Sequence, residues 1–179
     1  MSVLAYVLAS DDRLSGRVLD WRPPRWVRVW MLAATRLGDG WLWLLTAALL
    51  LASGNRGLRV LGAGAVAAGV ANALLVCVKG RVRRARPCER RRPRHFDVSP
   101  LAWFPGDRFS FPSGHALNSF AIGSVIALAF PLAAIPVLAV AASVAASRVV
   151  LGLHWLSDVL AGALVGLVIG TSVYVALLG

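Results

Sequence analysis

The feature that most constrains this chain is a series of long apolar runs separated by short polar breaks. The runs occupy residues 41–52, 58–78, 113–130, 132–150 and 156–178. A soluble domain of 179 residues could not bury a hydrophobic fraction of 58%. Helices can cross lipid because they satisfy their own backbone hydrogen bonds. We therefore expect an all-α, polytopic membrane helical bundle of about five transmembrane helices, the first of which is short for a crossing.

The segment before these runs differs because charged residues recur throughout it. Arginines alternate with Leu, Val and Trp, and Pro23 and Pro24 break the segment in two. This spacing of charges forbids a span and is typical of helices that lie in the membrane interface. We therefore expect residues 1–38 to form an interfacial amphipathic arm. Residues 39–179 would form the helical bundle, and the whole chain, 1–179, a single membrane domain.

The charge of the chain points to an anionic partner. Nineteen Lys and Arg face eight Asp and Glu, which gives a formal net charge of +11. The basic residues gather between apolar runs rather than along a soluble face, and this favours lipid head groups or phosphates over nucleic acid. The one long polar connection, residues 79–111, is too long for a simple hairpin, so we expect it to be an active-site loop.

Three polar stretches border the apolar runs, and alternate crossings would place all of them on one side of the membrane. They are Lys79 with Arg86-Pro87, the tetrapeptide Pro112-Ser113-Gly114-His115, and Ser147-Arg148 followed by His154 and Asp158. Ionisable groups beside lipid are costly and mark functional sites by default. We therefore expect the three stretches to form one pocket.

The residue types in this pocket suit a phosphate group. Lys79 supplies a point charge, while Arg86 and Arg148 offer planar forks that bind two oxygens each. Ser113 adds a hydroxyl donor. Gly114 would allow close backbone approach at the start of a helix, where amides favour anions. Together these groups would stabilise the charge of a phosphoryl transition state.

The two histidines of the pocket would divide the chemistry between them. His154 and Asp158 are four residues apart and would share a face if the segment is helical, so the carboxylate could hold one ring nitrogen protonated. The other nitrogen would then keep its lone pair for attack on phosphorus. This makes His154 the predicted nucleophile and His115 the predicted general acid.

The three stretches resemble the three signature motifs of the type 2 phosphatidic acid phosphatase superfamily. Lys79 to Pro87, Pro112 to His115 and Ser147 to Asp158 match the motifs in order and spacing. The resemblance implies a helical bundle and a metal-independent enzyme without a cofactor, whose His154 becomes phosphorylated. The implied partners are a lipid phosphate substrate and the bilayer, and the implied setting is a bacterial inner membrane.

Other interpretations compete with this one. His115, His154 and Asp158 could hold zinc, but Lys79 and the arginines would repel a cation, so no metal is expected. His95 matches no motif and is expected in a solvated loop. A protein that only binds or carries anionic lipid could use the same pocket, but it would not need an oriented His154.

Several properties stay open at this stage. The basic run from Arg81 to Arg94 could be a stripe against anionic lipid or could bind a second phosphate. The substrate could be a polyprenyl diphosphate, a phosphatidylglycerol phosphate or a phosphatidic acid. The sequence decides neither the oligomeric state nor the side of the membrane on which the site lies, since the positive-inside rule conflicts with the outward-facing sites of bacterial relatives.

Overall fold

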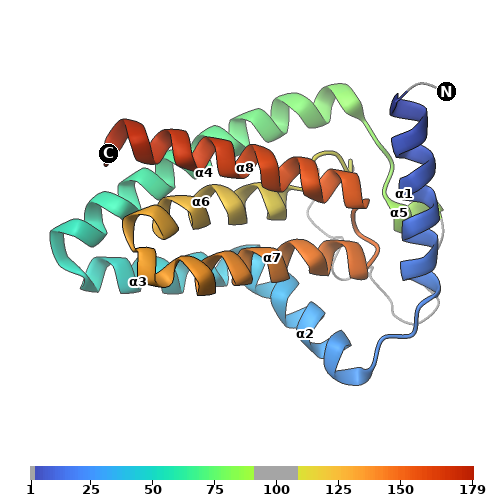
Figure 1. Cartoon of the computed structure of the whole chain (residues 1–179), viewed down its shortest axis with the longest axis horizontal. Helices are drawn as coiled ribbons and strands as arrows, with labels where there is room; N and C mark the ends of the chain where they lie inside the picture. The colour runs from blue at the N-terminus through green and yellow to red at the C-terminus, as the bar shows by residue number, and fades with distance from the viewer. Residues whose placement is uncertain (1–2, 91–108) are drawn as a thin grey trace.

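The computed structural model describes residues 3–90 and 109–179, and these residues form helices and short connections (Figure 1). The elements are α1 (Val3–Asp20), α2 (Arg25–Arg36), the π-helical turn η1 (Leu37–Trp41), α3 (Leu42–Ala52), α4 (Gly54–Val82), α5 (Pro87–Arg90), α6 (Gly114–Ala129), the 3-10 turn η3 (Pro131–Ala133), α7 (Ala134–Val150) and α8 (Leu156–Leu177). The described part of the chain contains no strand, so the predicted all-α class is confirmed.

The apolar runs seen in the sequence form the helices of the bundle. Three helical segments are long and apolar enough to cross a membrane: residues Gly54–Arg90, Pro131–Val150 and Leu156–Leu177. Helix α6 is equally apolar but has 16 residues, and α3 has 11. Helix α4 extends past the predicted run at both ends, so Lys79, which we expected in a loop, lies in the last turn of a helix.

Helix α6 forms the centre of the bundle and packs against α4, α7 and α8 (Figure 1). Its side chains Leu117, Ala121 and Val125 are fully buried in the core. Helix α1 lies across the end of the bundle at which α7 ends and α8 begins, and α2 packs against α7. This end of the bundle therefore brings together the end of α4, the start of α6, the end of α7 and the start of α8.

Helices α6 and α8 approach each other closely because α8 presents a glycine on three successive turns. A Cβ atom added at Gly162, Gly166 or Gly170 would lie within 2.7, 2.4 or 2.1 Å of a backbone carbonyl oxygen of α6 or of Ser113, the residue before it. Small residues at this spacing let helix backbones meet in lipid, where packing replaces the hydrophobic effect as the driving force. The contact fixes the start of α8 against the start of α6.

We predict that Gly166→Ala destabilises the bundle, because its methyl group would push against the carbonyl of Leu117. Overpacking of this kind costs about 1–3 kcal/mol and should lower the midpoint of thermal unfolding in detergent. Gly69→Ala is the matched control: nothing lies within 4 Å of its added Cβ, and Ala is the better helix former. Equal midpoints for the two variants would contradict the close α6–α8 contact.

Candidate active site

Backbone hydrogen bonds join the three motif segments at the end of the bundle crossed by α1. The bonds run from the amide of Ser110 to the carbonyl of Arg84, from Cys88 to Gly152 and from Ser113 to Asp158, with N···O distances of 2.8, 3.1 and 3.0 Å. Each bond connects segments that are far apart in the chain. The segments are therefore held in register by main-chain contacts, before any side chain of the site is considered.

All eight predicted site residues lie at or next to helix ends that meet at this end of the bundle (Figure 1). Lys79 lies in the last turn of α4, Arg148 in the last turn of α7, and Gly114 and His115 in the first turn of α6. Five of the eight are buried: Arg86, Ser113, Arg148, His154 and Asp158. Buried arginines require an anionic or strongly polar partner, so their positions agree with a phosphate site.

The imidazole of His154 is oriented by a backbone carbonyl. Its Nδ1 lies 2.6 Å from the carbonyl oxygen of Ser110, and the side chain is 1% exposed. A carbonyl oxygen only accepts hydrogen bonds, so Nδ1 carries a proton, and in the neutral ring Nε2 holds the lone pair. The ring is thus held as the tautomer that can attack through Nε2.

The predicted helical face shared by His154 and Asp158 is wrong. Helix α8 begins at Leu156, so His154 lies in the connection before it, and Nδ1 is 3.8 Å from the Asp158 carboxylate. That distance is too long for a hydrogen bond. Asp158 instead accepts a bond of 2.9 Å from the amide of Trp155, the residue after His154. It therefore orients the backbone beside His154 and caps the helix, as an acidic residue at this position commonly does.

Arg84 neutralises the buried carboxylate of Asp158. The two side chains form an ion pair of 2.6 Å, and Asp158 is 0% exposed. The second terminal nitrogen of Arg84 lies 2.7 Å from the carboxylate of Asp11, which belongs to α1. The sequence left open whether the run that includes Arg84 faces anionic lipid or binds a second phosphate. Arg84 instead pairs with two carboxylates of the protein, whereas Arg81 and Arg83 are exposed. The part of the run from residue 91 to residue 94, and His95, lie outside the described residues.

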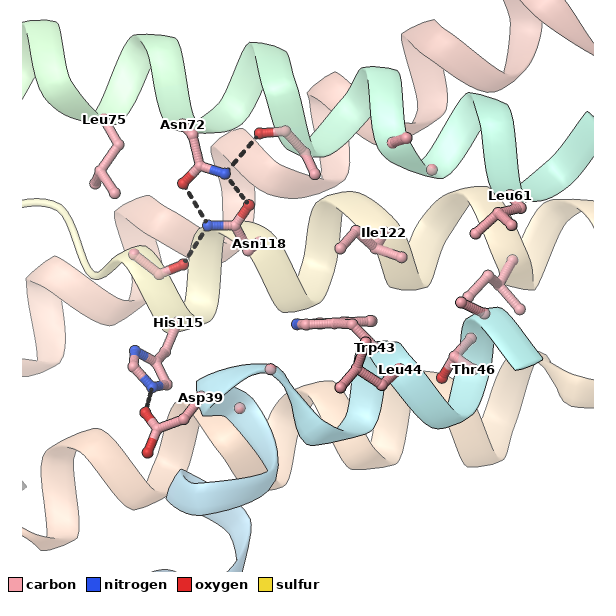
Figure 2. Close-up of a pocket in the computed structure, with 18 of the residues that line it drawn as sticks. Asp39, Trp43, Leu44, Thr46, Leu61, Asn72, Leu75, His115, Asn118 and Ile122 are labelled. Atoms are coloured by element: carbon pink, nitrogen blue, oxygen red, sulfur yellow. Dashed lines mark hydrogen bonds and ion pairs between the residues drawn. The ribbon is translucent and has the colours of Figure 1, made fainter. Parts of the chain in front are cut away.

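The other histidine of the site is paired with a carboxylate that sequence reasoning missed. Nε2 of His115 lies 2.8 Å from Oδ1 of Asp39, which lies in the turn η1 (Figure 2). Burial alone would raise the pKa of Asp39, but the hydrogen bond and charge of His115, with the charges of Arg148 and Arg36, lower it below its ordinary value. Asp39 is therefore ionised at neutral pH. The sequence marks Asp39 only by the glycines on either side of it, and these do not indicate its partner.

Ser113 and Arg148 show how the phosphate-binding groups are supported. The buried hydroxyl of Ser113 has no hydrogen-bond partner among the described residues, which leaves it able to donate to a ligand. Its backbone amide, however, donates to the carbonyl of Asp158, so this amide is not part of the anion site that we predicted at the start of α6. Arg148 donates to the hydroxyl of Thr35 at 2.5 Å, which ties α7 to α2.

Glycine is required at position 114 for a different physical reason from the one that we predicted. A Cβ atom at Gly114 would lie 2.9 Å from a methyl group of Leu75, so the glycine allows α6 to approach α4. We had expected the missing side chain to admit a ligand. Gly114 still borders the groove described next, and its contribution to phosphate binding stays a prediction.

A groove of about 730 Å³ runs between α3, α4 and α6 and reaches the site (Figure 2). Asp39, His115 and Lys79 line one end of it, and the rest is mainly apolar. Partway along, the side chains of Asn72 and Asn118 bond to each other in both directions, at 3.3 and 3.1 Å. The groove thus joins a charged end to an apolar interior within one continuous space.

Several known proteins are similar to this chain in sequence and in fold. The sequence profile of the PAP2 superfamily matches residues 57–178. The decaprenylphosphoryl-5-phosphoribose phosphatase of Mycobacterium tuberculosis is 35% identical over 139 residues, which cover 75% of this chain and 70% of that protein. The crystal structure of a transmembrane PAP2 type phosphatidylglycerolphosphate phosphatase from Bacillus subtilis matches with a TM-score of 0.70 and 26% identity, over 94% of this chain and 84% of that one.

A second solved structure supports the fold alone. LpxE of Aquifex aeolicus matches with a TM-score of 0.71 and 24% identity, over 90% of this chain and 92% of that one. The membrane helix bundle and the phosphatases among its relatives identify this protein as a membrane phosphatase. The chain belongs to the PAP2 superfamily, as the motif resemblance predicted.

We predict that Arg84→Met strongly destabilises the protein, because it leaves the carboxylate of Asp158 buried without its countercharge. Removing one partner of a buried pair costs about 3–5 kcal/mol. The readout is the unfolding midpoint in detergent, and Arg81→Met, at an exposed position of α4, should change stability by no more than about 0.5 kcal/mol. Equal unfolding midpoints for Arg84→Met and Arg81→Met would show that the ion pair between Arg84 and Asp158 does not stabilise the fold by this amount.

Proposed function

We propose that the protein hydrolyses a phosphate monoester or diphosphate of a lipid through a phosphohistidine intermediate on His154. The observation that supports this most directly is the bond from Nδ1 of His154 to the carbonyl of Ser110. A neutral imidazole attacks only through the nitrogen that has no proton, and this bond assigns that role to Nε2. A protein that merely bound anionic lipid would gain nothing from fixing the tautomer.

The surrounding groups would bind the phosphate and stabilise its transition state. Arg86 and Arg148 are buried beside the segment of His154, and the hydroxyl of Ser113 is available to donate. In phosphoryl transfer the charge is spread over the equatorial oxygens, and fixed donors act most strongly where water is excluded. Lys79 and Gly114 border the groove end of the site and would contact the same phosphate.

The reaction would proceed in two steps. The lone pair on Nε2 of His154 attacks phosphorus, the bond from phosphorus to the lipid oxygen breaks, and His115 donates a proton to that oxygen. Water then attacks the phosphohistidine while His115, now neutral, accepts a proton from it, and inorganic phosphate leaves. Asp158 keeps the segment of His154 in place through the amide of Trp155.

A lipid substrate is supported by the groove and by the relatives. The groove continues from His115 and Lys79 into an apolar interior, which suits a hydrocarbon chain behind a phosphorylated head group. The named relatives are phosphatases of decaprenylphosphoryl-5-phosphoribose and of phosphatidylglycerolphosphate. We propose that this chain acts on a lipid phosphate of this kind, in a bacterial inner membrane, as a single domain.

The experiment is phosphate release by the detergent-purified protein in excess chelator. The substrates are a phosphatidylglycerol phosphate, a phosphatidic acid, a polyprenyl diphosphate and decaprenylphosphoryl-5-phosphoribose. We expect the wild type to release phosphate from at least one of them, and His154→Ala to fall to the uncatalysed background. His95→Ala is the matched control, since this histidine belongs to no motif, and it should keep the wild-type rate.

The alternative outcomes separate the two candidate functions. Equal release by His154→Ala and wild type would contradict the nucleophile. A wild type that binds vesicles of anionic lipid but releases no phosphate from any substrate would favour the non-catalytic lipid-binding function. Loss of activity in chelator, restored by a divalent cation, would contradict the metal-independent mechanism.

A further inference from the structure

Asp39 and His115 form the closest contact between a histidine and a carboxylate in the described part of the chain. Their atoms are 2.8 Å apart, whereas the contact between His154 and Asp158 measures 3.8 Å. Both residues border the groove at its charged end, and their side chains are 25% and 18% exposed. The pair therefore lies where a lipid head group would meet the site, rather than in the core (Figure 2).

The turn η1 brings Asp39 to this position through its two glycines. A Cβ atom at Gly38 would lie 2.8 Å from Cδ2 of His115 and 2.7 Å from a methyl group of Val144, so the backbone passes directly against the imidazole. Gly40 has a φ of +132°, a conformation that residues with a side chain rarely adopt. The backbone of Gly38-Asp39-Gly40 thus packs directly against the ring of His115 and places the Asp39 carboxylate beside it.

In the part of the chain that the structure describes, Asp39 is a carboxylate in direct contact with His115. Arg36 before η1 and Arg148 on α7 contribute positive charge near the pair, and Lys79 on α4 lines the same groove. Arg36 lies 3.6 Å from the carboxylate of Asp39. Cations alone would oppose a protonated imidazole at this position, whereas a carboxylate at hydrogen-bonding distance stabilises it.

We propose that Asp39 is a positioning residue for the leaving-group step, an inference that rests on the proposed function. Its carboxylate accepts a hydrogen bond from the Nε2–H group of His115 and stabilises the imidazolium form. Nδ1 of His115 then donates its proton to the lipid oxygen as the bond from that oxygen to phosphorus breaks. The imidazole is left neutral, with Nε2 still bonded to Asp39, and Nδ1 can accept a proton from the water that attacks the phosphohistidine.

If Asp39 had only a structural role, its loss would affect the rates on different substrates in a different way. If the pair only held η1 against α6, its loss would slow every substrate alike. In the first step, a residue that acts through the general acid matters only when the leaving oxygen must be protonated, whereas the second step is common to all substrates. An alkyl alkoxide leaves poorly without a proton, whereas a nitrophenolate leaves readily without one. The leaving group of the substrate therefore separates the two roles.

The test compares an alkyl phosphate monoester, phosphatidic acid, with an aryl one, p-nitrophenyl phosphate, in detergent solution. The measured quantity is the single-turnover rate of the first step, the formation of phosphorylated enzyme, because the second step is the same for both substrates. We expect Asp39→Asn to lower this rate at least about 10-fold on the alkyl substrate, and His115→Ala about 100-fold or more. On the aryl substrate this first-step rate should stay within about threefold of the wild type for both variants, because the leaving oxygen needs no proton. The double variant should be no slower than His115→Ala, because Asp39 acts through His115.

Two further variants complete the design. Asp39→Glu restores the carboxylate and should recover part of the rate on the alkyl substrate. Asp12→Asn makes the same chemical change at an exposed carboxylate of α1 and should leave both rates unchanged. Equal losses of Asp39→Asn on both substrates, or additive losses in the double variant, would overturn this inference alone. A wild type inactive on both substrates would instead overturn the proposed function.

Discussion

The ion pair between Arg84 and Asp158 is the interaction on which the rest of the site depends. A carboxylate at 0% exposure next to lipid needs a countercharge, and Arg84 supplies it at 2.6 Å. The same arginine contacts Asp11 of α1, whose carboxylate also accepts from the amide of Ser157. One guanidinium group thus connects the N-terminal helix, the segment after α4 and the start of α8. Because Asp158 caps α8 through Trp155, the connection extends to the segment that carries His154.

The two histidines of the site have different partners, and the difference suits different tasks. A neutral carbonyl at Ser110 fixes the tautomer of His154 without adding charge, which preserves the nucleophilic lone pair. A carboxylate at Asp39 contacts His115, and this environment favours the protonated ring that an acid requires. The proposed division of labour therefore follows from the chemistry of the two acceptors. It no longer depends on the four-residue spacing of His154 and Asp158.

The fold could be predicted from the sequence because lipid imposes a simple pattern. The apolar runs ending at residues 130, 150 and 178 correspond to α6, α7 and α8 within two residues, since a membrane helix ends where polar residues begin. The motif residues could be named from their types and spacing. Their partners could not, because Asp39 is 76 residues from His115 and Arg84 is 74 from Asp158. Such pairs depend on how the helices pack, which no local pattern encodes.

The most direct test of the central claim is to trap the phosphorylated enzyme. His115→Ala should accumulate it from an aryl phosphate, since the first step needs no acid there while the second step has lost its base. After rapid quenching in alkali, which preserves a phosphorus–nitrogen bond, mass spectrometry of the peptides should place one phosphate on His154 and none in His154→Ala. A phosphate on any other residue, or steady release by His115→Ala with no phosphorylated enzyme at any time point, would contradict the account.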